Sequence, residues 1–86
     1  MPEICRFFGI VIKIFYDDHN PPHFHASYGN DRAVIDIQTL GLFAGTLPPR
    51  AQSLVVEWAS LHRAELIACW ERAQNMMPPG SIPPLS

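Results

Sequence analysis

The residues of this chain that could do chemistry are concentrated in the stretch 17–25, which reads Asp-Asp-His-Asn-Pro-Pro-His-Phe-His. We call it the histidine segment. It holds three of the four histidines of the 86-residue chain and two of its eight acidic residues. An imidazole exchanges protons near neutral pH and is a common metal ligand, and the adjacent prolines restrict the backbone between these groups. The spacing therefore predicts a functional site.

His23 and His25 are two positions apart in a run that favours a strand, so their side chains leave the same face of it. We expect a general acid/base pair, in which one imidazole accepts a proton while the other donates, with His19 assisting and no cofactor required. Two alternatives stay open. In one, the histidines hold a divalent metal ion such as zinc at about 2.0–2.1 Å, with His19, Asp17 or Asp18 as third ligand. In the other, they are solvated residues of a surface strand.

Charged residues around this pair support either chemistry. Lys13 and Arg32 are candidates to stabilise the negative charge of a phosphate, and Asp17 and Asp18 are candidates to orient the imidazoles. His62 lies on the apolar stripe of a predicted helix. It either reaches the histidine segment or is a core histidine bonded to backbone, and the second arrangement is the commoner one.

Strand patterns precede and follow the histidine segment. β-branched and aromatic residues dominate the first part of the chain, where Gly9 predicts a bulge or a sharp bend. The turn-forming stretch Gly29-Asn30-Asp31 predicts a hairpin. The sequence therefore predicts an antiparallel meander of about four strands. The extended runs cover residues 4–16, 23–28, 32–38 and 40–47.

The rest of the chain predicts one long helix. Apolar residues at three- and four-residue steps, among them Trp58, Leu66 and Trp70, form a stripe over residues 48–76. The stripe continues through residues 60–62, the one place where the pattern allows a bend, so we predict a single helix that packs on one face of the sheet. Prolines at its start suit a first helical turn.

These elements predict an α+β fold, with a single domain over residues 1–77 and a mobile, proline-rich tail over residues 78–86. Six basic against eight acidic residues give a net charge of −2, which argues against strong sequence-independent binding to nucleic acid. Cys5 and Cys69 form no CxxC pair, so no disulfide framework or thiolate zinc site is indicated. No apolar run approaches the ~20 residues of a membrane span. We expect a cytoplasmic protein.

Several stretches together resemble one known family. They are Arg-Phe-Phe-Gly-Ile, the histidine segment, Ile-Asp-Ile, Leu-Pro-Pro-Arg and the run from Glu-Trp to the second tryptophan. Over residues 2 to about 74 they are similar to a family of small bacterial proteins, the domain-of-unknown-function family 4160. Its members are commonly encoded beside a second small protein, in pairs that resemble toxin–antitoxin modules, so the resemblance implies an antitoxin-like partner. Together with the acid/base chemistry inferred for the histidine pair, this leads us to expect a toxin-like protein that cleaves RNA phosphodiesters without a metal. The alternative is a non-catalytic module whose histidines bind a metal or the partner protein.

Overall fold

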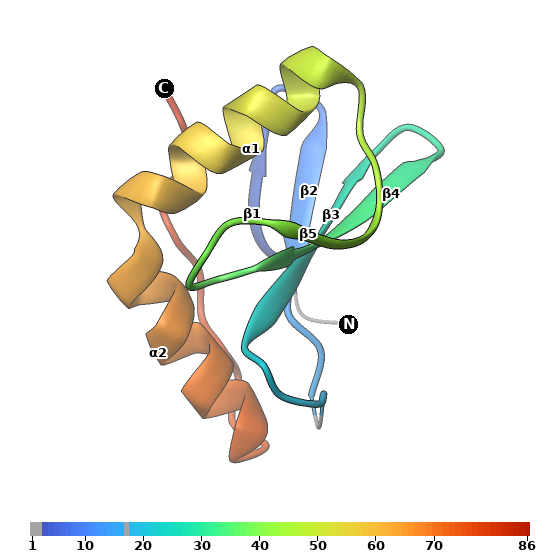
Figure 1. The fold of residues 1–86 in the computed structure, drawn as a ribbon. Helices are drawn as coiled ribbons and strands as arrows, with labels where there is room; N and C mark the ends of the chain where they lie inside the picture. Colours follow the sequence, from blue (N-terminus) through green and yellow to red (C-terminus); the bar gives the residue numbers. More distant parts are fainter. Residues whose placement is uncertain (1–2, 17) are drawn as a thin grey trace.

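The computed structural model describes residues 3–16 and 18–86 and shows an α+β fold (Figure 1). Five antiparallel strands form one sheet in the order β1-β2-β3-β4-β5, so each strand pairs with its neighbours in the chain. Two helices follow the last strand. The strands are β1 (Glu3–Phe7), β2 (Ile10–Lys13), β3 (His23–Tyr28), β4 (Asp31–Asp36) and β5 (Leu42–Gly45), and the helices are α1 (Pro49–Leu61) and α2 (Arg63–Gln74).

The predicted meander is confirmed as antiparallel, but it has five strands rather than about four. The difference arises at Gly9. Phe8 and Gly9 both have positive φ, 48° and 80°, which makes a two-residue hairpin turn where a glycine relieves the strain. The first extended run therefore divides into β1 and β2. The hairpin predicted at residues 29–31 is present, with Gly29 at φ 59° between β3 and β4.

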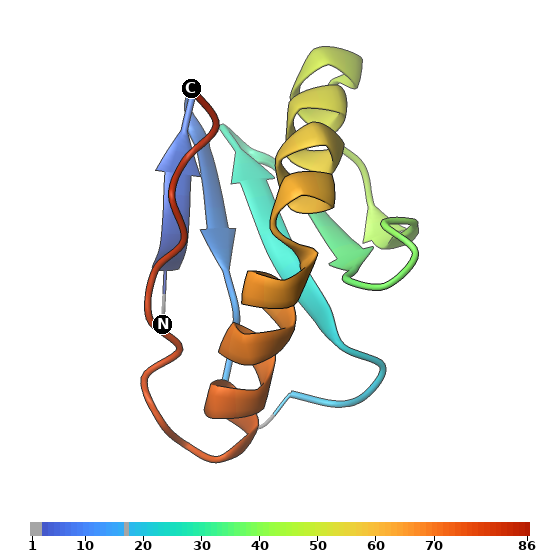
Figure 2. The same cartoon turned by 90° about the vertical axis from the view of Figure 1, so that its left-hand side faces the viewer.

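Both helices cover the same face of the sheet (Figure 2). Alternate residues of the central strands point into this layer because successive side chains of a strand leave opposite faces. Phe24, Ile12 and Ile35 are fully buried there, as are Trp58 and Leu66 of the helices. The opposite parity includes both histidines of β3; His25 is partly exposed on that face, whereas His23, at the start of the strand, lies where Trp70 of α2 packs against it.

The prediction of one helix over residues 48–76 is wrong in detail. His62 has φ −128° and ψ 25°, which ends α1, and its carbonyl accepts the first backbone hydrogen bond of α2 from Leu66 at 2.8 Å. The break lets two shorter helices follow the twisted sheet, and it leaves Leu61 66% exposed although it belongs to the predicted apolar stripe. No helix in the described part of the chain is long and apolar enough to cross a membrane.

The C-terminal segment, residues 78–86, runs back along β1 (Figure 2). Ile82 is 4% exposed, and its N–H donates to the carbonyl of Ile4 at 2.9 Å. Trp58 Nε1 donates to the carbonyl of Pro83 at 2.9 Å, and Arg72 donates to that of Pro79. These contacts close the outer edge of β1. They lead us to predict that the segment stabilises the domain, although its composition predicts a mobile tail.

Candidate metal centre

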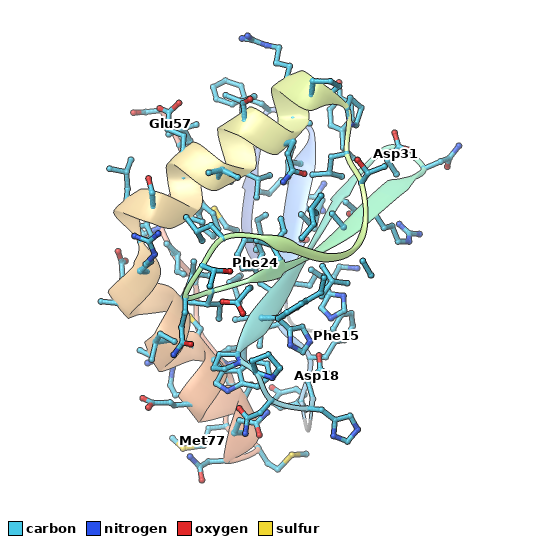
Figure 3. The ribbon with its side chains drawn as sticks, viewed as in Figure 1. Phe15, Asp18, Phe24, Asp31, Glu57 and Met77 are labelled. Carbon is cyan, nitrogen blue, oxygen red and sulfur yellow. The ribbon has the colours of Figure 1, made fainter. Side chains whose placement is uncertain are left out.

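Three side chains of the histidine segment converge at the start of β3. Asp18 Oδ2 lies 2.8 Å from His23 Nε2 and 3.3 Å from His25 Nε2. One ligand atom from each residue lies within 4.8 Å of both others. Figure 3 shows Asp18 beside Phe15 at this end of the sheet, whereas Asp31 marks the hairpin at the far end of β3. The predicted pairing of His23 and His25 on one strand face is present, and Asp18 is their common partner.

Two hydrogen bonds from outside the histidine pair hold Asp18. Gln74 of α2 donates from Nε2 to the backbone carbonyl of Asp18 at 2.9 Å. The backbone N–H of His19 donates to Oδ1 at 3.1 Å. These bonds leave Oδ2 directed at the two imidazoles, so the carboxylate is oriented by groups that do not belong to the centre itself.

His23 is fixed through both ring nitrogens. Its Nδ1 lies 2.8 Å from the carbonyl oxygen of Pro21, which can only accept, so Nδ1 carries a hydrogen. Its Nε2 faces Asp18. With a hydrogen, Nε2 donates to Asp18 Oδ2; without one, Nε2 offers a lone pair that can bind a metal ion.

Aromatic side chains pack around the two imidazoles. The ring of Trp70 lies 5.1 Å and that of Phe43 6.1 Å from the ring of His23, and Phe15 meets His25 edge-on at 4.5 Å. The side chain of His23 is only 11% exposed, against 24% for Asp18 and 33% for His25. The centre is therefore closed on the His23 side and open on the His25 side.

The centre favours an ionised carboxylate. Burial raises the pKa of the Asp18 carboxyl. The hydrogen bond from His25, the backbone N–H of His19 and the charge and hydrogen bond of His23 lower it by more, so the pKa of Asp18 lies below its ordinary value. Asp18 thus offers a full negative charge between two imidazoles.

The other predicted site residues divide into two groups. Lys13 lies directly across from His25 on β2, and Arg32 lies on β4 opposite Ser27, so both share the open face with His25. His19 is exposed, and its side chain is not part of the convergent group found among the described residues. His62 bonds to Glu65 and packs against Trp58, at the junction of the helices. Asp17 lies outside the described residues.

Sequence reasoning missed the residues that orient the centre. Trp70 appeared as a core residue only, and it is buried, but it also packs against His23. Gln74 carried no signal, since a polar residue late in a helix is ordinary. Asp36 of β4, which is not part of the centre, is 8% exposed, and its Oδ1 accepts from the backbone N–H groups of Gln38 and Thr39.

Neither cysteine contributes to the centre. Cys5 and Cys69 are both buried and unbridged. Burial raises the pKa of each thiol, which disfavours the thiolate that nucleophilic attack and metal binding need.

The fold and the site define a small α+β protein that carries a two-histidine, one-carboxylate centre at the start of β3. Residues 9–71 match the family described as Domain of unknown function (DUF4160), and the chain belongs to this family. No curated protein and no solved structure matches the chain. The matched range contains Asp18, His23 and His25, whereas Gln74 and the C-terminal segment lie beyond it.

Proposed function

We propose that Asp18, His23 and His25 bind a divalent transition-metal ion and that the protein is a metal-dependent hydrolase. The observation that supports this most is the position of Asp18 Oδ2, 2.8 and 3.3 Å from the two Nε2 atoms. Zinc bonds of about 2.0–2.1 Å in tetrahedral geometry separate ligand atoms by about 3.3–3.4 Å. The Asp18–His23 pair would therefore open by about half an ångström.

The surroundings of the ligands support the same function. A metal-binding histidine usually donates its other ring N–H to a carbonyl or carboxylate, which orients the lone pair. His23 does this through Nδ1 and the carbonyl of Pro21. Asp18 is likewise oriented through Oδ1 and its backbone carbonyl.

The donor set also supports hydrolysis. Two imidazoles and one carboxylate are used by catalytic zinc sites that keep a further position for water. A zinc ion in such a site lowers the pKa of a bound water and polarises the bond to be cleaved. In the overall reaction, the water oxygen bonds to the electrophilic atom of the substrate, the bond to the leaving group breaks, and the leaving group takes up a proton from the water. The open His25 side provides the approach for the substrate.

The competing mechanism is a metal-free acid/base pair formed by His23 and His25. Each imidazole in such a pair must reach the reacting atoms. His23 is 11% exposed and has an oxygen acceptor at each ring nitrogen, which favours a ligand role over proton transfer to a substrate. A chelator separates the two mechanisms, because only the metal-dependent one loses activity in its presence.

The test of the centre is a zinc titration of the full chain against a competing chelating dye. We expect one ion per chain. His23→Ala, His25→Ala and Asp18→Asn should each weaken zinc binding by about 100-fold or more, since even substitutions of groups that merely orient ligands cost 10–100-fold. The matched controls are His19→Ala and His62→Ala, which remove the two histidines outside the centre and should leave the affinity unchanged.

Two results would contradict the proposal. One is the absence of stoichiometric zinc, manganese or iron(II) binding by wild-type protein. The other is an equal loss of affinity in all four histidine variants, which would indicate nonspecific binding. Circular dichroism of each variant confirms that the fold is retained.

A toxin-like role beside a small antitoxin-like partner is a further part of the proposal. It rests on the family resemblance, in which paired small proteins are common. A cytoplasmic location is included, supported by the two unbridged cysteines, which suit a reducing compartment. Growth inhibition on expression of the chain alone tests this role.

A further inference from the structure

A hollow of about 380 Å³ adjoins the proposed metal centre on the open face of the sheet. His25 belongs to both, since it lines the hollow and bonds to Asp18. Lys13 and Arg32 also line the hollow, together with small and apolar residues of β3, β4 and β5. Among residues 3–16 and 18–86, no acidic residue lines it. The hollow is therefore a positively charged depression with the metal centre at its border.

The strand register places the two cations close to His25. Lys13 is the direct partner of His25 across β2 and β3, and directly opposed residues have Cβ atoms about 4.5–5.5 Å apart. Arg32 is the direct partner of Ser27, two positions along β3 from His25, so it is a diagonal neighbour at about 7–8 Å. Both long side chains can reach a group that lies over His25.

Both cations are available to a ligand. Within residues 3–16 and 18–86, neither Lys13 nor Arg32 forms an ion pair. Glu3, which lies opposite Lys13 on β1, is bound by Arg6 through two hydrogen bonds of 2.9 and 3.1 Å. The chain has only six basic residues, so two of them at one hollow give it an anion-binding character that the net charge does not predict.

We propose, on the basis of the metal-dependent hydrolase inferred above, that the hollow binds the phosphoryl group of a phosphodiester substrate. The planar guanidinium of Arg32 can donate two parallel hydrogen bonds to phosphate oxygens, and Lys13 adds a compact charge. His25 would hold the metal ion and also lines the hollow, so a phosphoryl group bound there by Lys13 and Arg32 would lie beside the ion. In the reaction, water oxygen bonds to phosphorus, the P–O bond to the leaving alcohol breaks, and that alcohol takes up a proton from the water.

The test uses zinc-loaded protein, with inorganic phosphate as the binding probe and bis(4-nitrophenyl) phosphate as the substrate. Lys13→Ala and Arg32→Gln should each weaken phosphate binding, measured by calorimetry, by about 10–100-fold, the range for one lost charge-assisted hydrogen bond. The same variants should lower kcat/KM for the diester. Arg63→Gln, which removes an exposed arginine of α2, is the matched control and should match wild type in both assays.

Zinc affinity, measured separately on every variant, distinguishes the two proposals. Unchanged zinc affinity with weakened phosphate binding in Lys13→Ala and Arg32→Gln supports the phosphate site. Normal zinc binding with phosphate affinity equal to that of Arg63→Gln overturns the phosphate site and leaves the metal centre intact. Absence of zinc, manganese and iron(II) binding in wild type overturns both.

Discussion

The most informative stability prediction concerns Ile82 in the C-terminal segment. Its side chain is 4% exposed, and its N–H bonds to β1. Truncation of a buried isoleucine to alanine costs 2–5 kcal/mol, and we expect about 2–3 kcal/mol here because Ile82 lies at the edge of the core, where neighbours can relax. For a domain of this size, that corresponds to a fall in Tm of roughly 10–20 °C.

The matched control is Leu61→Ala. Leu61 belongs to the predicted apolar stripe but is 66% exposed, so its truncation should change the free energy of unfolding by less than about 0.5 kcal/mol. Urea denaturation followed by tryptophan fluorescence measures both variants, and Trp58 reports on the segment because it bonds to Pro83. Equal midpoints for Ile82→Ala, Leu61→Ala and wild type would refute the reasoning and support a mobile tail.

Three further predictions concern the strands and the site. Gly45→Ala should destabilise the fold by about 3–6 kcal/mol, because the residue has φ 69° and an added Cβ would lie 2.1 Å from a backbone carbonyl oxygen. Gly29→Ala should cost only about 1–2 kcal/mol, because Gly29 has φ 59° but open space around the added Cβ. Equal denaturation midpoints for the two variants would contradict this. Gln74→Ala should weaken zinc binding by about 10-fold with little change in Tm, because the Gln74 side chain orients Asp18 through a hydrogen bond to its backbone carbonyl. Unchanged zinc affinity would show that this hydrogen bond is dispensable. If the proposed toxin-like role holds, expression of the chain alone should inhibit bacterial growth and degrade RNA in a chelator-sensitive reaction. A His25→Ala variant that is equally toxic would separate toxicity from the centre.

Local patterns determined much of this protein. The two-residue period of a strand placed His23 and His25 on one face, and Gly29 predicted the hairpin that follows. The apolar stripe predicted that Trp58 and Leu66 are buried, and both are. Each of these features depends only on residues a few positions apart in the chain, so the sequence alone is sufficient to predict it.

Tertiary structure decided the course of the helix and of the C-terminal segment. Trp58, His62 and Leu66 follow one another at four-residue steps, so periodicity could not reveal the break at His62. The segment after the helix is held by bonds to Ile4 and Trp58, residues that only the folded chain brings near.

Tertiary structure also decided which residues join the histidine pair. Asp17, Asp18 and His19 were equal candidates in the sequence, because a turn has no period that assigns its side chains to a face. Of the two candidates that the structure describes, Asp18 and His19, it is Asp18 whose backbone is held by the Gln74 amide, 56 positions away in the chain, and whose Oδ2 faces both imidazoles. An orientation set by so distant a contact exists only once the helix has packed on the sheet.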